Sequence, residues 1–148
     1  MYKALYIAKW FINYNLKLRD IDNEDTDNIT NLKLQKLLYY AQGSMLALKD
    51  KLLFSDEILA WSHGPVVKVV YDEFKHNGSN GIDEYFENIS VDNDTEQVLI
   101  QVYNIFGRYS AWGLRNMTHQ ESPWLETKRN EVITIDKIKK YFKGNYVE

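Results

Sequence analysis

Apolar residues recur at intervals of three and four along most of the chain, and this spacing marks one face of an α-helix. The first such stripe lies within residues 2–18 and is formed by Leu5, Ala8, Ile12 and Leu16. Further apolar side chains lie beside it, so the apolar face is broad. This breadth predicts an N-terminal helix that is largely covered by other helices.

The stripe within residues 31–48 predicts the central helix of the fold. Its apolar members are Leu34, Leu37, Leu38, Ala41, Met45 and Leu48. Lys33, Lys36 and Gln42 fall largely off this stripe. Thr30 stands directly before the helix, where its hydroxyl can accept a hydrogen bond from an amide of the first turn.

The segment from Leu52 to Trp61 allows two interpretations, a short strand around Ile58 or an irregular crossing of the fold. After the turn that follows, Pro65 at a first helical position predicts a helix over Val66–Lys75. We expect the buried face of this helix to contain Val67, Val70, Tyr71 and Phe74.

Cap residues indicate four further helices in the second half of the chain. They begin at Asp92 or Asp94, at Ser110, at Ser122-Pro123 and at Thr134, and the first two run to about Tyr109 and Met117. The chain has only 2 Pro and 7 Gly, which leaves few turns for a strand architecture. Residues 1–148 are therefore expected to form a single domain of the all-α class. We expect a compact bundle of about six or seven helices, with at most one short pair of strands near residues 53–61.

The acidic stretch from Asp20 to Asn28 has acidic residues at alternate positions, as a calcium-binding loop does. In the frame that begins at Asp20, Asp25 stands where that loop needs Gly, and Asn31 stands where it needs Glu. We therefore interpret the stretch as a solvated connection between the first two helices.

Composition and charge exclude several classes of protein. The chain has 148 residues, a net charge of −3 and no cysteine, which excludes a disulfide scaffold, a thiol nucleophile and cysteine-ligated metals. No segment is apolar for long enough to span a membrane or to serve as a signal peptide, so we expect a soluble, cytoplasmic protein without a membrane partner. The charge balance favours no nucleic-acid partner, and the lysines of residues 137–143 are interpreted as a solvated helix face.

No arrangement of residues indicates catalysis. The histidines are His63, His76 and His119. His119 and Glu121 match half of the zinc-deaminase motif, but the cysteine half is absent. A histidine that is hydrogen-bonded at a helix boundary is the preferred interpretation, and an enzyme acting through His119 and Glu121 is the alternative. We expect no catalytic residue, no metal and no cofactor.

Aromatic residues make up 14% of the chain, a high fraction. A tryptophan can fill the core or anchor a binding face. The core is favoured, but both roles stay open for Trp10, Trp61, Trp112 and Trp124.

Several short motifs follow one another in an order that is specific to one family. They are residues 29–43 (ITNLKLQKLLYYAQG), 53–54 (LF), 60–61 (AW), 63–67 (HGPVV), 70–71 (VY), 74–75 (FK), 109–111 (YSA) and 118–124 (THQESPW). Together they resemble the SocA-like, or Panacea, antitoxin family, and the resemblance extends over about residues 5–142. His63 departs from the family pattern, which usually has Tyr before the Gly-Pro turn.

The resemblance implies a phage- or prophage-associated antitoxin that neutralises a cognate toxin, encoded by an adjacent gene, through direct protein–protein binding. Two alternatives stay open: a proteolytic adaptor that delivers a toxin to a ClpXP-type protease, and a phage or host-interaction protein without a toxin. The family supplies no catalytic residue, so we expect no enzyme. The candidate partner-binding or family-motif residues are Trp61, His63, Gly64, Pro65, Tyr71, His119, Glu121, Pro123 and Trp124.

Overall fold

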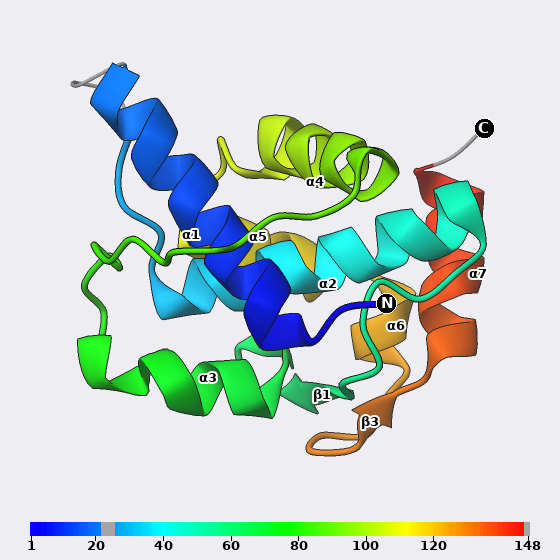
Figure 1. Cartoon of the computed structure of the whole chain (residues 1–148). Helices are drawn as coiled ribbons and strands as arrows, with labels where there is room; N and C mark the ends of the chain where they lie inside the picture. Colours follow the sequence, from blue (N-terminus) through cyan, green and yellow to red (C-terminus); the bar gives the residue numbers. More distant parts are fainter. Residues whose placement is uncertain (22–25, 147–148) are drawn as a thin grey trace.

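The computed structural model describes residues 1–21 and 26–146 of the chain (Figure 1). Within these ranges, the regular elements are α1 (Ala4–Ile21), α2 (Asn31–Lys49), β1 (Ile58–Trp61), β2 (Gly64–Val66), α3 (Lys68–Phe74), the 3-10 helix η1 (Lys75–Asn77), α4 (Asn93–Phe106), α5 (Ala111–Thr118), α6 (Ser122–Leu125), β3 (Val132–Ile133) and α7 (Ile135–Asn145). The predicted, mainly helical fold is confirmed.

Helix α2 crosses the middle of the molecule, where α1, α4, α5 and α7 all contact it (Figure 1). Leu34, Leu37 and Leu38 are fully buried, as the apolar stripe predicts. The Thr30 hydroxyl accepts a hydrogen bond from the Lys33 amide at 3.2 Å, so the predicted cap is confirmed. This helix therefore forms the centre of the hydrophobic core.

Gly43 lies where α7 packs closely on α2. A Cβ atom at this position would overlap the ring of Phe142, which is fully buried. The Phe142 ring also packs edge-on against Tyr39 of α2, with 5.4 Å between the ring centroids. The missing side chain at Gly43 therefore gives the C-terminal helix room to approach the central one.

Lys36 and Gln42 of α2 are buried, although they fall largely off the predicted apolar stripe. Lys36 is 1% exposed and Gln42 is 0% exposed, whereas Leu48, a member of the stripe, is 44% exposed. Because other elements cover α2 on more than one face, its polar side chains must form their hydrogen bonds inside the protein. Gln42 donates to the Phe54 carbonyl at 2.7 Å and accepts from the Leu53 amide at 2.8 Å.

The short strands form an antiparallel sheet with the order β2-β1-β3. β1 begins at Ile58, which confirms a strand in the ambiguous segment, whereas β3 near the C-terminus was not predicted. The prediction of a helix that starts beside Pro65 is wrong. Pro65 lies in β2 opposite Ala60, and α3 begins only at Lys68. β2 tolerates a proline because it is an edge strand, where one side of the backbone needs no partner.

The helix starts predicted in the second half are mostly confirmed. The N-caps whose side chains accept a hydrogen bond from a backbone amide are Asp92, Ser110 and Thr134. α4 ends at Phe106, slightly before the predicted Tyr109. Ser122 is an exception, because Glu121 takes the N-cap position and Ser122 is the first residue of α6.

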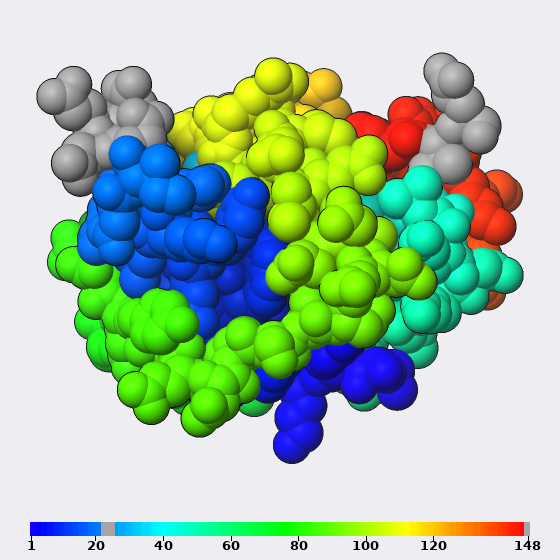
Figure 2. Space-filling model, turned by 45° about the horizontal axis from the view of Figure 1, so that its top comes forward, coloured from blue at the N-terminus to red at the C-terminus, as the bar shows by residue number. Residues whose placement is uncertain are grey.

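The segment between η1 and α4 runs across α1 (Figure 1), and Figure 2 shows it as a continuous band of atoms that leads into α4. The side-chain amide of Asn13 donates to the Phe86 carbonyl at 2.8 Å and accepts from the Phe86 amide at 2.9 Å. The Tyr6 hydroxyl donates to the Ser90 carbonyl and accepts from the Ser90 amide, both at 2.9 Å. These bonds hold an irregular segment against the first helix.

The predicted solvated connection from Asp20 to Asn28 falls partly on residues 22–25, which lie outside the described residues. At its two ends, Asp20 is exposed and Asn28 accepts a hydrogen bond from Arg19 at 3.1 Å. Among the helices that the structure describes, none combines the length and the apolar character that a membrane crossing needs.

The position of α2 can be tested by truncating one of its buried side chains. Leu38→Ala should lower the free energy of unfolding by about 2–5 kcal/mol, because it leaves a cavity in the core. Leu48→Ala on the same helix should cost less than about 1 kcal/mol, because Leu48 is 44% exposed. Urea denaturation of the two variants measures the difference, and equal losses would contradict the observed packing.

Candidate functional site

The motif residues around the His63-Gly64-Pro65 turn lie beside the motif of residues 118–124, although the two are far apart in the sequence. The indole N–H of Trp124 donates a hydrogen bond to the carbonyl of Trp61 at 2.8 Å. The Trp124 ring also stacks on His119, with 3.8 Å between the ring centroids. The candidate residues of both motifs therefore belong to one region of the molecule.

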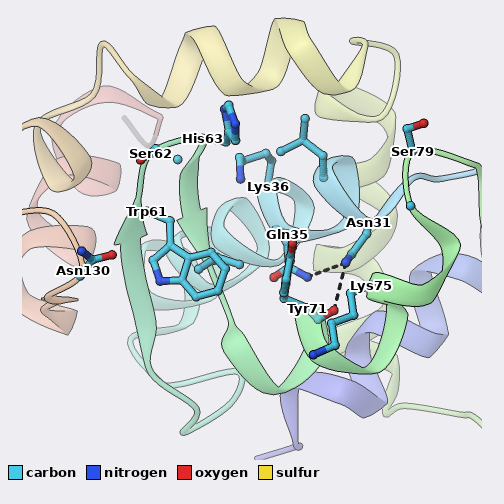
Figure 3. A pocket seen from close by; sticks show the side chains of 14 residues that line it. Asn31, Gln35, Lys36, Trp61, Ser62, His63, Tyr71, Lys75, Ser79 and Asn130 are labelled. Carbon is cyan, nitrogen blue, oxygen red and sulfur yellow. Dashed lines mark hydrogen bonds between the residues drawn. The ribbon is translucent and has the colours of Figure 1, made fainter.

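A pocket of about 640 Å³ opens beside the turn between β1 and β2 (Figure 3). The predicted residues that line it are Trp61, His63, Gly64 and Tyr71. Helix α2 contributes Asn31, Gln35 and Lys36 to the same pocket. The rings of Trp61 and Tyr71 meet edge to face, with 5.1 Å between their centroids, and give the pocket an aromatic wall.

Polar side chains of α2 bind the start of α3 to the central helix. The Gln35 amide donates to the side-chain oxygen of Asn31 at 2.9 Å, and the Asn31 amide donates to the Tyr71 carbonyl at 3.1 Å (Figure 3). The side-chain oxygen of Gln35 also accepts from the Val67 amide at 2.9 Å. These bonds hold Tyr71 in place at the edge of the pocket.

Lys36 is a buried cation of this pocket, and the sequence pattern did not identify it as a site residue. Its ammonium donates a hydrogen bond to the carbonyl of Pro65 at 2.9 Å. Burial lowers the pKa of the Lys36 ammonium to about 7, and the nearby charge of Arg115 acts in the same direction. At neutral pH the amine is therefore close to the point where it gains or loses a proton.

Gly64 leaves the space that the Lys36 side chain needs. Its φ of +107° is a conformation that residues with a side chain rarely adopt. A Cβ atom at Gly64 would lie 2.8 Å from Cε of Lys36 and 2.8 Å from the hydroxyl oxygen of Thr118. The backbone conformation and the close packing therefore both require a glycine in this turn.

An exposed cluster lies next to the pocket and consists of His63, Trp112 and Arg115. The guanidinium carbon of Arg115 lies 4.3 Å from the centre of the Trp112 ring, and its Nε donates to Nδ1 of His63 at 3.3 Å. Trp112 is 54% exposed, whereas Trp10 is 6% exposed. Trp10 therefore fills the core, whereas Trp112 lies at the surface.

Glu121 lies in the interior, where it is 3% exposed. Its carboxylate accepts hydrogen bonds from the hydroxyls of Tyr39 and Tyr40 at 2.9 Å each and of Tyr146 at 2.7 Å. Burial raises the pKa of the Glu121 carboxyl above its ordinary value, although the three hydrogen bonds act in the opposite direction. Pro123 is buried as well. Glu121 and Pro123 therefore support the site from the interior and do not form part of its surface.

His119 is the C-cap residue of α5, so this histidine lies at a helix boundary, as predicted. Its Nε2 is buried and has no hydrogen-bond partner among the described residues, so the hydrogen bond expected there is not found at this atom. Burial lowers the pKa of the His119 imidazole, and the charges of Arg115, Lys36 and Arg129 lower it further. A neutral ring, stacked on Trp124, fits these surroundings.

The arrangement of acidic and histidine side chains gives no metal centre in the part of the chain that the structure describes. No group of three or more His, Asp or Glu side chains in residues 1–21 and 26–146 is placed to hold an ion. Glu121 is bound by tyrosine hydroxyls, and His119 packs on Trp124. His119 and Glu121, which match half of the zinc-deaminase motif in sequence, therefore lie in separate surroundings.

Substitution at Gly64 tests the geometry of the turn. Gly64→Ala should lower the free energy of unfolding by about 1–3 kcal/mol or more, because it combines a strained backbone with a close contact to Lys36. Gly144→Ala is the matched control, since no atom lies within 4 Å of a Cβ at that helical position, and it should leave stability unchanged or slightly higher. If Gly64→Ala unfolds at the same temperature as the parent, the turn geometry described above is contradicted.

Glu121→Gln tests the buried carboxyl through the pH dependence of stability. A pKa that is higher in the folded state stabilises the fold at acid pH, and this contribution is lost as the pH rises through the folded pKa. The unfolding free energy of the parent minus that of the variant should therefore decrease between about pH 4 and pH 8. Urea denaturation across this range gives the difference, and an increase with pH would show that the carboxylate is stabilised instead.

The candidate site lies in a part of the chain that matches a known family. The model of the antitoxin SocA-like Panacea domain matches residues 34–125, which include Lys36, Gly64 and Glu121. Antitoxin SocA of Caulobacter vibrioides (strain NA1000 / CB15N) is 34% identical over 109 residues, which cover 65% of this chain and 58% of that protein. The chain thus matches less than two thirds of that relative's length. No solved structure matches the chain.

Proposed function

The chain belongs to the SocA-like Panacea-domain antitoxin family, and we propose that it neutralises a cognate toxin by direct protein–protein binding. We further propose that the toxin is encoded by an adjacent gene. A binding role is consistent with the part of the chain that the structure describes. Several candidate residues line a surface pocket there, whereas the carboxylate of Glu121 is enclosed by tyrosine hydroxyls.

The observation that carries the proposal is the exposed cluster of His63, Trp112 and Arg115. Tryptophan, tyrosine and arginine are the residue types that contribute most to binding energy at protein interfaces. Trp112 leaves 54% of its surface in solvent, and Arg115 packs on its ring. A large side chain that is held in one orientation loses little conformational freedom on binding, which favours affinity.

The proposed interface surrounds the pocket mouth. His63 belongs both to the cluster and to the pocket lining, so the two features are continuous. Trp61 and Tyr71 supply further aromatic surface on the pocket wall. A toxin that covers the cluster would therefore also cover the opening of the pocket.

Trp112→Ala tests this proposal without removing a core side chain. Co-expression with the protein of the adjacent gene should show loss of rescue from growth arrest, and the affinity of the purified pair should fall by about 30-fold or more. His63→Ala should weaken binding as well, and both variants should unfold at the temperature of the parent. Tyr85→Ala is the control, because Tyr85 is 69% exposed and lines a different pocket.

Each outcome of this experiment bears on a separate part of the proposal. Full rescue by Trp112→Ala and His63→Ala would place the interface elsewhere on the molecule. Failure of the parent to bind or neutralise its neighbour would contradict the antitoxin role itself. Toxin loss that depends on a ClpXP-type protease would replace neutralisation by binding with delivery to that protease.

A further inference from the structure

We propose that the pocket beside the His63-Gly64-Pro65 turn receives an acidic side chain of the toxin, whose carboxylate pairs with the ammonium of Lys36. This inference rests on the proposed function and names the chemistry of the toxin segment that binds there. It adds a charge-specific contact to an interface whose outer part is aromatic.

The first argument is a set of cations without a counter-ion. The charges of Arg115 and Lys36 lie close enough to affect each other and His119. Among the described residues, neither Lys36 nor Arg115 takes part in an ion pair with a carboxylate. Lysine is almost never fully buried unless it is paired, so an incoming carboxylate would supply the partner that the protonated Lys36 amine lacks.

The second argument is the unused hydrogen-bonding capacity of Lys36. An ammonium has three N–H donors, and the structure gives this one a single acceptor among the described residues, the Pro65 carbonyl at 2.9 Å. Lys36 is 1% exposed, yet it lines the pocket (Figure 3). A carboxylate that enters the pocket would supply acceptors for the remaining donors at a site that bulk water hardly reaches.

The third argument is the chemistry and the size of the pocket. Its lining contains Lys36, Lys75 and His63 but no acidic side chain. The aromatic wall of Trp61 and Tyr71 would face the apolar part of an occupant. A volume of about 640 Å³ is far more than a single inorganic anion needs and lies in the range of sites for larger ligands. These features fit a short peptide segment with an acidic and an apolar residue.

A proton should accompany binding above neutral pH. The groups around the Lys36 amine are Arg115 and His119 of the α5 end and His63 of the turn, and no carboxylate of a described residue pairs with it. Burial and Arg115 hold the pKa of the free amine at about 7, and a carboxylate partner would raise it. Binding should therefore take up a proton above about pH 7 and become weaker as the pH rises further.

Lys36→Met removes the charge while keeping a long, flexible side chain in the same space. Affinity for the co-expressed toxin should fall at least about tenfold. The unfolding temperature should change little, because loss of the hydrogen bond to the Pro65 carbonyl is offset by removal of a buried ammonium that has no carboxylate partner. Lys33→Met is the matched control on the same helix. Lys33 is partly buried and also donates to a backbone carbonyl, that of Gly107, but it lines another pocket. The control variant should keep the parent's affinity.

Calorimetry in buffers of different ionisation enthalpy separates this role from a structural one. With the parent at about pH 8, the heat of toxin binding should depend on the buffer and report proton uptake, and with Lys36→Met this dependence should vanish. If Lys36→Met binds as tightly as the parent, with the same proton uptake, the proposed pairing is overturned.

The pocket can also be tested without the toxin, so that failure of the antitoxin role does not affect the result. N-acetyl-Trp-Glu-amide should shift the amide resonances of Ser62, Gly64 and Ser79 in the parent, and N-acetyl-Trp-Gln-amide should not. No shift with the acidic dipeptide, or equal shifts with both, would overturn the inference. Inorganic phosphate that displaces the dipeptide at equal concentration would also overturn it, because the pocket would then be a site for free anions.

Discussion

The structure depends on one constraint: the central helix α2 is covered on several faces and yet carries polar side chains. Each buried polar group must find a partner inside the protein, because an unmet hydrogen bond is costly there. Gln42 binds the backbone of Leu53 and Phe54, and Gln35 binds the amide of Val67. These contacts hold in place the chain segments that precede β1 and follow β2.

The same constraint explains the region around the pocket. Tyr39 and Tyr40, which follow Lys36 on α2, enclose the carboxylate of Glu121 and so place the start of α6. Lys36 binds the carbonyl of Pro65, and Gly64 provides the space for its side chain. The carboxylate of Glu121 is enclosed by hydrogen-bond donors of the protein, whereas the Lys36 ammonium has a single acceptor among the described residues. The central helix therefore both organises the fold and supplies the charge in the pocket.

The sequence predicts most of the helices because their signals are local. The apolar stripes and the side chains of Thr30, Asp92, Ser110 and Thr134 mark helix positions without reference to distant residues. Burial of Lys36 and Gln42 could not be predicted in this way, because periodicity identifies the apolar face of a helix but not whether its polar face is also covered. The helix predicted to start beside Pro65 was wrong for a related reason, since a proline fits an edge strand as well as a helix start.

For the candidate site, too, local signals could be read from the sequence, whereas contacts between distant residues could not. The sequence identifies the residues around His63 and those around His119 as short motifs. Their contact could not be predicted, because it is the fold that brings them together. Trp112 and Arg115 were missed as a pair, although their spacing of three on the helix capped by Ser110 places them on one face.

We propose that the surface formed by the pocket mouth and the exposed cluster of His63, Trp112 and Arg115 binds the toxin. Hydrogen–deuterium exchange of the chain, alone and in complex with the protein of the adjacent gene, tests it most directly. We expect slower exchange in the complex at residues 61–66 and 111–119. Protection confined to other segments, such as residues 82–91, with no change at the turn and at α5, would contradict it.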